Sequence, residues 1–166
     1  MSFIIAEAED VVANPLDLVE QIVIANEWPF DRQTEDEMAV EITGKFCDFR
    51  LWFAWRPETA ALHLSCALDM KVPAGRRANI YPLLAQLNER LWLGHFDLWT
   101  EESVPLFRHT LLVRGGPLTP EHVEEVVDIA VSECERAYPA FQFVIWGGKT
   151  ADEAITAAMF ETVGEA

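Results

Sequence analysis

The stretch FVIWGGKT at residues 143–150 contains the residue types of a phosphate-binding loop. A P-loop requires a strand, then GxxxxGK[ST], then a helix, because its backbone amides cradle phosphate and its lysine reaches the phosphate oxygens. Here Phe143 stands where the first glycine is needed, and the segment before the loop has helical spacing. The alternative is that Gly147 and Gly148 end one helix and that Thr150 and Glu153 form a capping box that begins the next. We therefore expect a structural turn here and no nucleotide site.

The histidines and cysteines form no familiar catalytic or metal-binding motif. His95 and Asp97 share one face of a predicted strand and could supply two metal ligands, but no third ligand accompanies them. Cys66 lies three residues from His63, which places the two on opposite faces of their strand. Cys66 and Cys134 both keep the apolar phase of their elements, as buried thiols do. We accordingly predict no catalytic residue, no metal ligand and no cofactor.

Aromatic side chains are abundant, with six tryptophans and ten phenylalanines in 166 residues. Trp52 and Trp55 lie near the end of a predicted strand, on opposite faces of it. Trp99 belongs to a junction that is crowded with aromatic side chains. Core packing together with a self-association surface explains this pattern, and a groove for a client peptide is the alternative. We take Trp52, Trp55 and Trp99 as candidates for a partner or dimer surface.

The net charge of −16 limits the kinds of partner. Residues 1–45 carry 11 acidic and two basic residues, residues 46–118 carry seven and eight, and residues 119–166 carry ten and two. Such a field repels nucleic acid and anionic membranes over a Debye length of roughly 8 Å, and it attracts basic partners. We expect neither nucleic acid nor a membrane as partner, and a protein partner with a basic surface fits best.

Three features of the sequence are typical of a cytoplasmic protein. No apolar run approaches the ~20 residues that a membrane-spanning helix needs. The start, MSFIIAEAED, has no basic region before its apolar residues, unlike a secretory signal. The three cysteines are odd in number and form no CxxC pair, which suits a reducing compartment.

Hydrophobic periodicity predicts one α+β domain over residues 1–166. Helical spacing predicts helices over residues 15–26, around residues 80–91 and from residue 119 to residue 144, followed by a short C-terminal helix. Alternation predicts strands at residues 38–43, 46–55, 61–69, 95–100 and 106–113. The order is α-β-β-β-α-β-β-α plus the short helix, which makes a two-layer fold of an antiparallel five-stranded sheet with helices.

Three segments resemble the YbjN-domain family of bacterial proteins. They are NERLWLGHFDLW at residues 88–99, CERAYPAFQFVIWGGKTADEA at residues 134–154 and ETVGEA at residues 161–166. The resemblance implies a fold similar to type III secretion chaperones, which are typically small, acidic and dimeric and bind other proteins without catalysis. Members of the family are described as sensory-transduction regulators. The resemblance supplies no functional residue that can be transferred to this chain.

Two hypotheses from different classes follow from the sequence. The first is a non-enzymatic regulatory or chaperone-like module that binds a protein partner and forms a homodimer. The second is a small-ligand sensor or an enzyme with an unrecognised pocket. The first is favoured because no candidate nucleophile is accompanied by a base.

Overall fold

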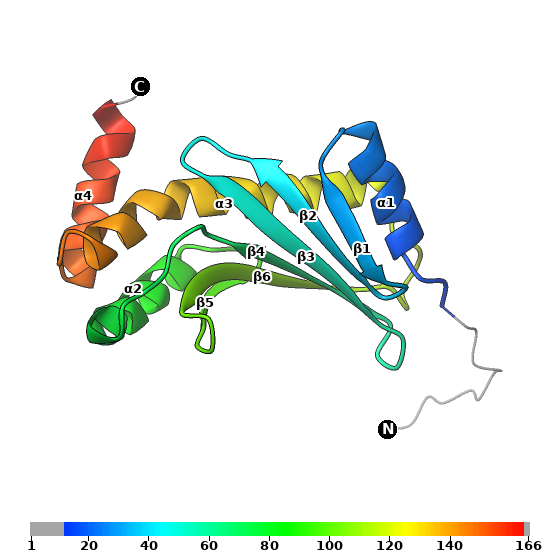
Figure 1. The fold of residues 1–166 in the computed structure, drawn as a ribbon, viewed down its shortest axis with the longest axis horizontal. Helices are drawn as coiled ribbons and strands as arrows, with labels where there is room; N and C mark the ends of the chain where they lie inside the picture. The colour runs from blue at the N-terminus through cyan, green and yellow to red at the C-terminus, as the bar shows by residue number, and fades with distance from the viewer. Residues whose placement is uncertain (1–11, 165–166) are drawn as a thin grey trace.

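A twisted antiparallel sheet forms one layer of the protein, and helices pack against one of its faces (Figure 1). The computed structural model describes residues 12–164, so the start of the chain, where no secretory signal is expected, lies outside the described residues. The helices are α1 (Leu16–Ala25), α2 (Arg77–Glu89), α3 (Pro120–Ile145) and α4 (Ala151–Gly164), with a 3-10 turn at Ala74–Arg76 before α2. The strands are β1 (Phe30–Thr34), β2 (Glu37–Thr43), β3 (Asp48–Arg56), β4 (Ala61–Ala67), β5 (His95–Trp99) and β6 (Val104–Leu112).

The sheet has six strands in the order β1-β2-β3-β4-β6-β5, so the prediction of five strands is wrong. The strand that the prediction missed is β1, whose sequence FDRQT contains a single apolar residue and whose side chains are largely exposed. It is a strand because its backbone pairs with β2, with Phe30 opposite Val40 and Arg32 opposite Met38. A polar edge strand of this kind carries no apolar alternation from which it could be recognised.

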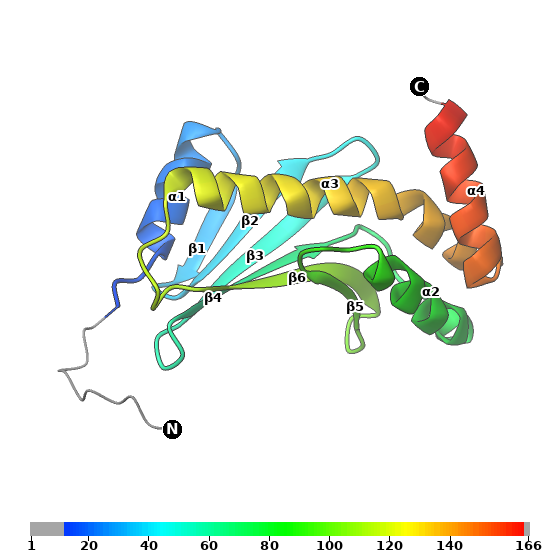
Figure 2. The same cartoon turned by 180° about the vertical axis from the view of Figure 1, so that it is seen from behind.

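Helix α3 runs along one face of the sheet, with α1 beside it (Figure 2). Its apolar residues, spaced alternately four and three apart, all point into the core, as the spacing predicted; they are Val123, Val127, Ala130, Cys134, Ala137, Phe141 and Val144. The helix continues through Pro139, which is buried. Across the layer boundary, the inward side chains of β3 are Phe49, Leu51, Phe53 and Trp55. Burying each such side chain contributes roughly 1.5–3 kcal/mol, so this interface holds the two layers together.

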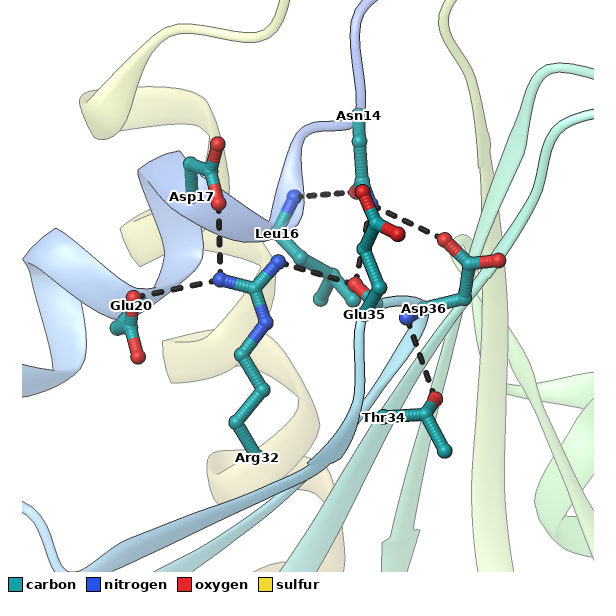
Figure 3. Close-up of polar contacts among 8 residues, drawn as sticks. All are labelled: Asn14, Leu16, Asp17, Glu20, Arg32, Thr34, Glu35 and Asp36. Carbon is teal, nitrogen blue, oxygen red and sulfur yellow. Dashed lines mark hydrogen bonds and ion pairs between the residues drawn. The ribbon is translucent and has the colours of Figure 1, made fainter.

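A cluster of hydrogen bonds around Arg32 links α1 to the β1–β2 hairpin (Figure 3). The Arg32 guanidinium donates to Asp17 Oδ1 at 2.8 Å, to Glu20 Oε2 at 3.3 Å and to the carbonyl oxygen of Glu35 at 2.9 Å. Asn14 acts at the start of α1, where its Oδ1 accepts the N–H of Leu16 at 2.9 Å, as expected for a capping asparagine. These contacts fix the N-terminal helix relative to the edge of the sheet.

Candidate functional site

The glycine turn after α3 is a helix boundary, as the sequence predicted. Helix α3 ends at Ile145, α4 begins at Ala151, and Gly148 between them has a φ of +65°, which favours glycine. The Thr150 Oγ1 accepts the N–H of Glu153 at 3.3 Å, and the Glu153 carboxylate accepts the N–H of Thr150 at 3.3 Å. This reciprocal pair is the predicted capping box, and it satisfies the amides that a phosphate would otherwise need.

The cysteines are packing residues rather than reactive ones. Cys66 and Cys134 are fully buried, and the Cys134 Sγ donates to the carbonyl oxygen of Cys66 at 3.8 Å. Burial raises the pKa of the Cys134 thiol well above its ordinary value, which disfavours the nucleophilic thiolate. Burial also raises the pKa of the half-buried Cys47.

His95 and Asp97, the two candidate metal ligands, both lie beside Arg108 of the neighbouring strand β6. The Asp97 carboxylate accepts a hydrogen bond from the Arg108 guanidinium of β6 at 3.1 Å, and His95 lies opposite Arg108 in the strand register. Within residues 12–164, no group of three or more His, Cys, Asp or Glu side chains could hold a metal ion.

The face of the sheet turned away from α1 and α3, called the open face below, is the candidate functional surface. No helix of the described chain packs on it in either view (Figures 1 and 2). The alternation along β3 places Arg50, Trp52 and Ala54 on this face, because the residues between them are buried on the other. Trp55 is one of those buried residues, with 2% of its surface exposed.

The three candidate tryptophans therefore separate into two roles. Trp55 belongs to the core beneath the helices, so its assignment to a partner surface is corrected here. Trp52 of β3 and Trp99 of β5 lie on the open face and contact each other, with ring centroids 6.0 Å apart and an interplanar angle of 86°. Their strands are separated by β4 and β6, which contribute to this face the small residues Ser65 and Ala67 of β4 and the larger Leu106 and Arg108 of β6.

The surface around the two rings is hollowed rather than flat. A groove of about 270 Å³ lies beside the ring pair, and its lining includes Trp52, Ser65, Trp99 and Leu106. Two further depressions flank Trp52 on the same face. A partly exposed indole surrounded by hollows is the arrangement that anchors a partner side chain.

Each of three arginines on the open face, Arg50, Arg56 and Arg108, contacts a neighbouring side chain. Arg50 lies over the Trp52 ring at 5.8 Å, and Arg56 lies 3.7 Å from the Glu37 carboxylate. Strands β3 to β6, which make most of this face, all come from residues 46–118, the segment in which acidic and basic residues nearly balance. The acidic α3 lies on the opposite side of the sheet. The open face therefore repels an acidic molecule less than the rest of the protein does.

Two basic residues of this surface, Arg50 and Arg108, were not among the candidate site residues. The sequence does place Arg50 on the same strand face as Trp52, because the two alternate along one strand. Arg108 could not be placed in this way, since its position beside Asp97 depends on β6 lying between β4 and β5, and periodicity does not give strand order.

Comparison with known proteins bears on the fold and the family. Residues 15–143 match the YbjN family model, described as "Putative bacterial sensory transduction regulator". The crystal structure described as "YbjN, a putative transcription regulator from E. coli" is similar in fold, with a TM-score of 0.53. The two share 14% sequence identity, and the match covers 71% of this chain and 84% of that one. No curated protein sequence matches the chain. Among residues 12–164, the helices lack the combined length and apolar character needed to cross a bilayer.

Proposed function

Because the chain belongs to the YbjN family, whose members are described as regulators, we propose that it is a non-enzymatic regulatory module that binds proteins through its open face. The observation that carries this proposal is the Trp52–Trp99 pair on a sheet face that no described helix covers. Tryptophan combines large apolar area with an N–H donor, and it is enriched at the energetic centres of interfaces. A chaperone-like mode of binding, in the cytoplasm, is part of the same proposal.

The first occupant that we propose for the open face is a second copy of this chain. A two-fold axis near Trp52 would bring the same surface of both copies together, and such isologous contacts are the commonest in soluble oligomers. The near balance of charge in residues 46–118 lets two copies meet there despite a net charge of −16 each. A homodimer formed in this way leaves the acidic α3 side available to a partner with a basic surface.

Light scattering coupled to size exclusion tests the dimer directly. We expect a dimer mass at tens of micromolar in physiological salt, and we expect Trp52→Ser to shift it towards monomer. Trp146→Ser is the matched control, because this tryptophan is 61% exposed and lies at the end of α3, away from the open face. A monomer mass for the parent chain, or a Trp52→Ser protein that dimerises like the parent, would contradict the proposed dimer.

The alternative is a small-ligand sensor or an enzyme that uses the groove lined by Trp52 and Trp99. The groove volume of about 270 Å³ lies near the lower end of the range for small-molecule sites, roughly 300–1,000 Å³. A thermal-shift panel of metabolites separates the two functions. A large shift with one compound, abolished by Trp99→Ser, would favour the sensor over the protein-binding module.

A further inference from the structure

Helices α2, α3 and α4 converge at one end of the molecule (Figures 1 and 2), and another hollow is lined by residues of all three. It is a groove of about 290 Å³ whose residues recur at helical spacing on each of the three helices. Leu87 of α2 and Arg90, which directly follows α2, line it on one side, while α4 contributes Ile155 and Met159. This groove is separate from the open face, and the family match ends at residue 143, before α4 begins.

Apolar side chains form the walls and floor of the groove. Ala137 and Ala140 of α3 and Ala158 of α4 are small and buried, so the hollow exists where larger side chains would have filled it. Met159 on one wall is 60% exposed, so its side chain is accessible to a ligand. An apolar hollow of this kind favours an apolar ligand, since filling it removes water from hydrocarbon surface on both sides.

Two arginines, Arg90 and Arg136, stand at the groove. The side chain of Arg136 is 71% exposed, so its guanidinium can reach a ligand even though it lies 3.2 Å from the Glu133 carboxylate. Arg136 is notable because it is one of only two basic residues in residues 119–166, which also contain ten acidic ones, whereas Arg90 comes from the nearly balanced residues 46–118. A guanidinium pair beside an apolar hollow is suited to a carboxylate, which arginine binds with paired hydrogen bonds.

Hydrogen bonds outside the groove fix the position of α4 relative to α2. The Gln86 side chain of α2 donates to Asp152 Oδ1 of α4 at 2.7 Å, and the capping box at Thr150 fixes where α4 begins. The direction of α4 relative to α2 is therefore set by contacts outside the groove. A site formed in advance loses less conformational entropy when a ligand binds.

We propose that this groove binds the acyl chain of a fatty acid, with the carboxylate head paired to Arg90 and Arg136. The volume is too small for a partner helix, whose diameter is roughly 10–12 Å, and it suits a short hydrocarbon chain. The charge of the head group distinguishes this site from non-specific adsorption. The protein as a whole is acidic and attracts cationic amphiphiles, so stronger binding of an anionic amphiphile than of a cationic one would have to come from Arg90 and Arg136. The site goes beyond the proposed protein-binding function and does not depend on it.

Isothermal titration with dodecanoate, below the concentration at which it forms micelles, tests this site. We expect saturable binding of one dodecanoate per chain. The amphiphile dodecyltrimethylammonium, which has the same chain length and a positive head, should bind at least about tenfold more weakly. The double variant Arg90→Gln/Arg136→Gln should weaken dodecanoate binding by a similar factor. Arg114→Gln should not, because Arg114 is an exposed arginine in the loop between β6 and α3 and does not line the groove.

The hollow itself is tested by Ala158→Leu, which should fill it and abolish dodecanoate binding. A circular-dichroism melt of each variant shows whether the fold is retained, and the arginine variants, whose side chains are exposed, keep the proposal testable if Ala158→Leu unfolds. Equal binding of the two amphiphiles, or undiminished binding by the double arginine variant, would mean non-specific adsorption and overturn the site. Trp52→Ser should leave dodecanoate binding unchanged, so failure of this site and failure of the proposed dimer are observed separately.

Discussion

At the scale of single residues, Thr150 and Lys149 separate the structural and phosphate-binding interpretations of the glycine turn. Thr150→Ala removes the acceptor for the Glu153 N–H, and we expect a loss of ~1 kcal/mol in the free energy of unfolding, measured by urea denaturation. Lys149→Ala removes only a long contact, with its Nζ 6.0 Å from the Phe143 ring centroid, and should cost less than ~0.5 kcal/mol. ATP or GTP binding that disappears in Lys149→Ala would contradict the structural interpretation.

Substitutions of Cys134 test whether its side chain is buried in the core. The side chain is fully buried between α3 and β4, so Cys134→Ser places a hydroxyl in an apolar site and should destabilise the protein by roughly 1–3 kcal/mol. Cys134→Ala leaves only a small cavity and should be milder. Rapid labelling of Cys134 by a thiol reagent in the folded protein would show that this burial is wrong.

The raised pKa of the Cys134 thiol predicts a dependence of stability on pH. An unfolded cysteine loses its proton near its ordinary pKa of 9.0, whereas the folded thiol holds its proton to higher pH because burial disfavours the thiolate. The unfolded state therefore binds fewer protons above pH 9, and the free energy of unfolding should fall as pH rises from there. Cys47 and Tyr138, whose pKa values burial also raises, act in the same direction. Urea denaturation between pH 8 and pH 11 should show a shallower decline in Cys134→Ala, and an identical decline would refute this explanation.

At the scale of elements, the sequence predicted those that bury a periodic apolar face. Helix α3 was recognised along its whole length, through Pro139, because its apolar residues alternate four and three apart. Strand β1 was missed because its neighbours, not its own side chains, make it a strand. The alternation of β3 placed Trp52 and Trp55 on opposite faces, but which face the helices cover depends on packing between distant segments. Trp52 and Trp99 lie partly exposed on the open face and Trp55 is buried, so a partner surface at Trp52 and Trp99 stays a prediction.

The Arg32 cluster predicts how firmly α1 is attached to the sheet. Arg32→Met keeps the apolar stem but removes the bonds to Asp17, Glu20 and Glu35, and we expect a loss of about 1–2 kcal/mol because the Arg32 side chain is only 20% exposed. Hydrogen exchange in α1 should rise in parallel.

The matched control for the Arg32 cluster is Arg56→Met. This arginine pairs with Glu37 at 3.7 Å on the surface and should contribute less than ~0.5 kcal/mol. Equal losses in the two variants would show that the Arg32 cluster adds no more than an exposed ion pair.

At the scale of the whole molecule, salt should strengthen the proposed dimer. Two copies with a net charge of −16 each repel one another over a Debye length of roughly 30 Å at 0.01 M salt but only about 8 Å at 0.15 M. We therefore expect the dissociation constant to decrease between these two concentrations, as measured by sedimentation equilibrium. A dimer that weakens as salt rises would instead indicate an interface held by opposite charges.

The separation of the acidic α3 side from the nearly balanced strands β3 to β6 also gives the molecule an electric dipole moment. At concentrations too low for the proposed dimer to form, the single chain should adsorb on a positively charged support with α3 towards the surface and with its sheet towards the solution. Such a layer would present Trp52 uniformly to molecules flowing past it, without any engineered tag. Coupling by adsorption would thus orient the protein for binding measurements, which random covalent attachment does not.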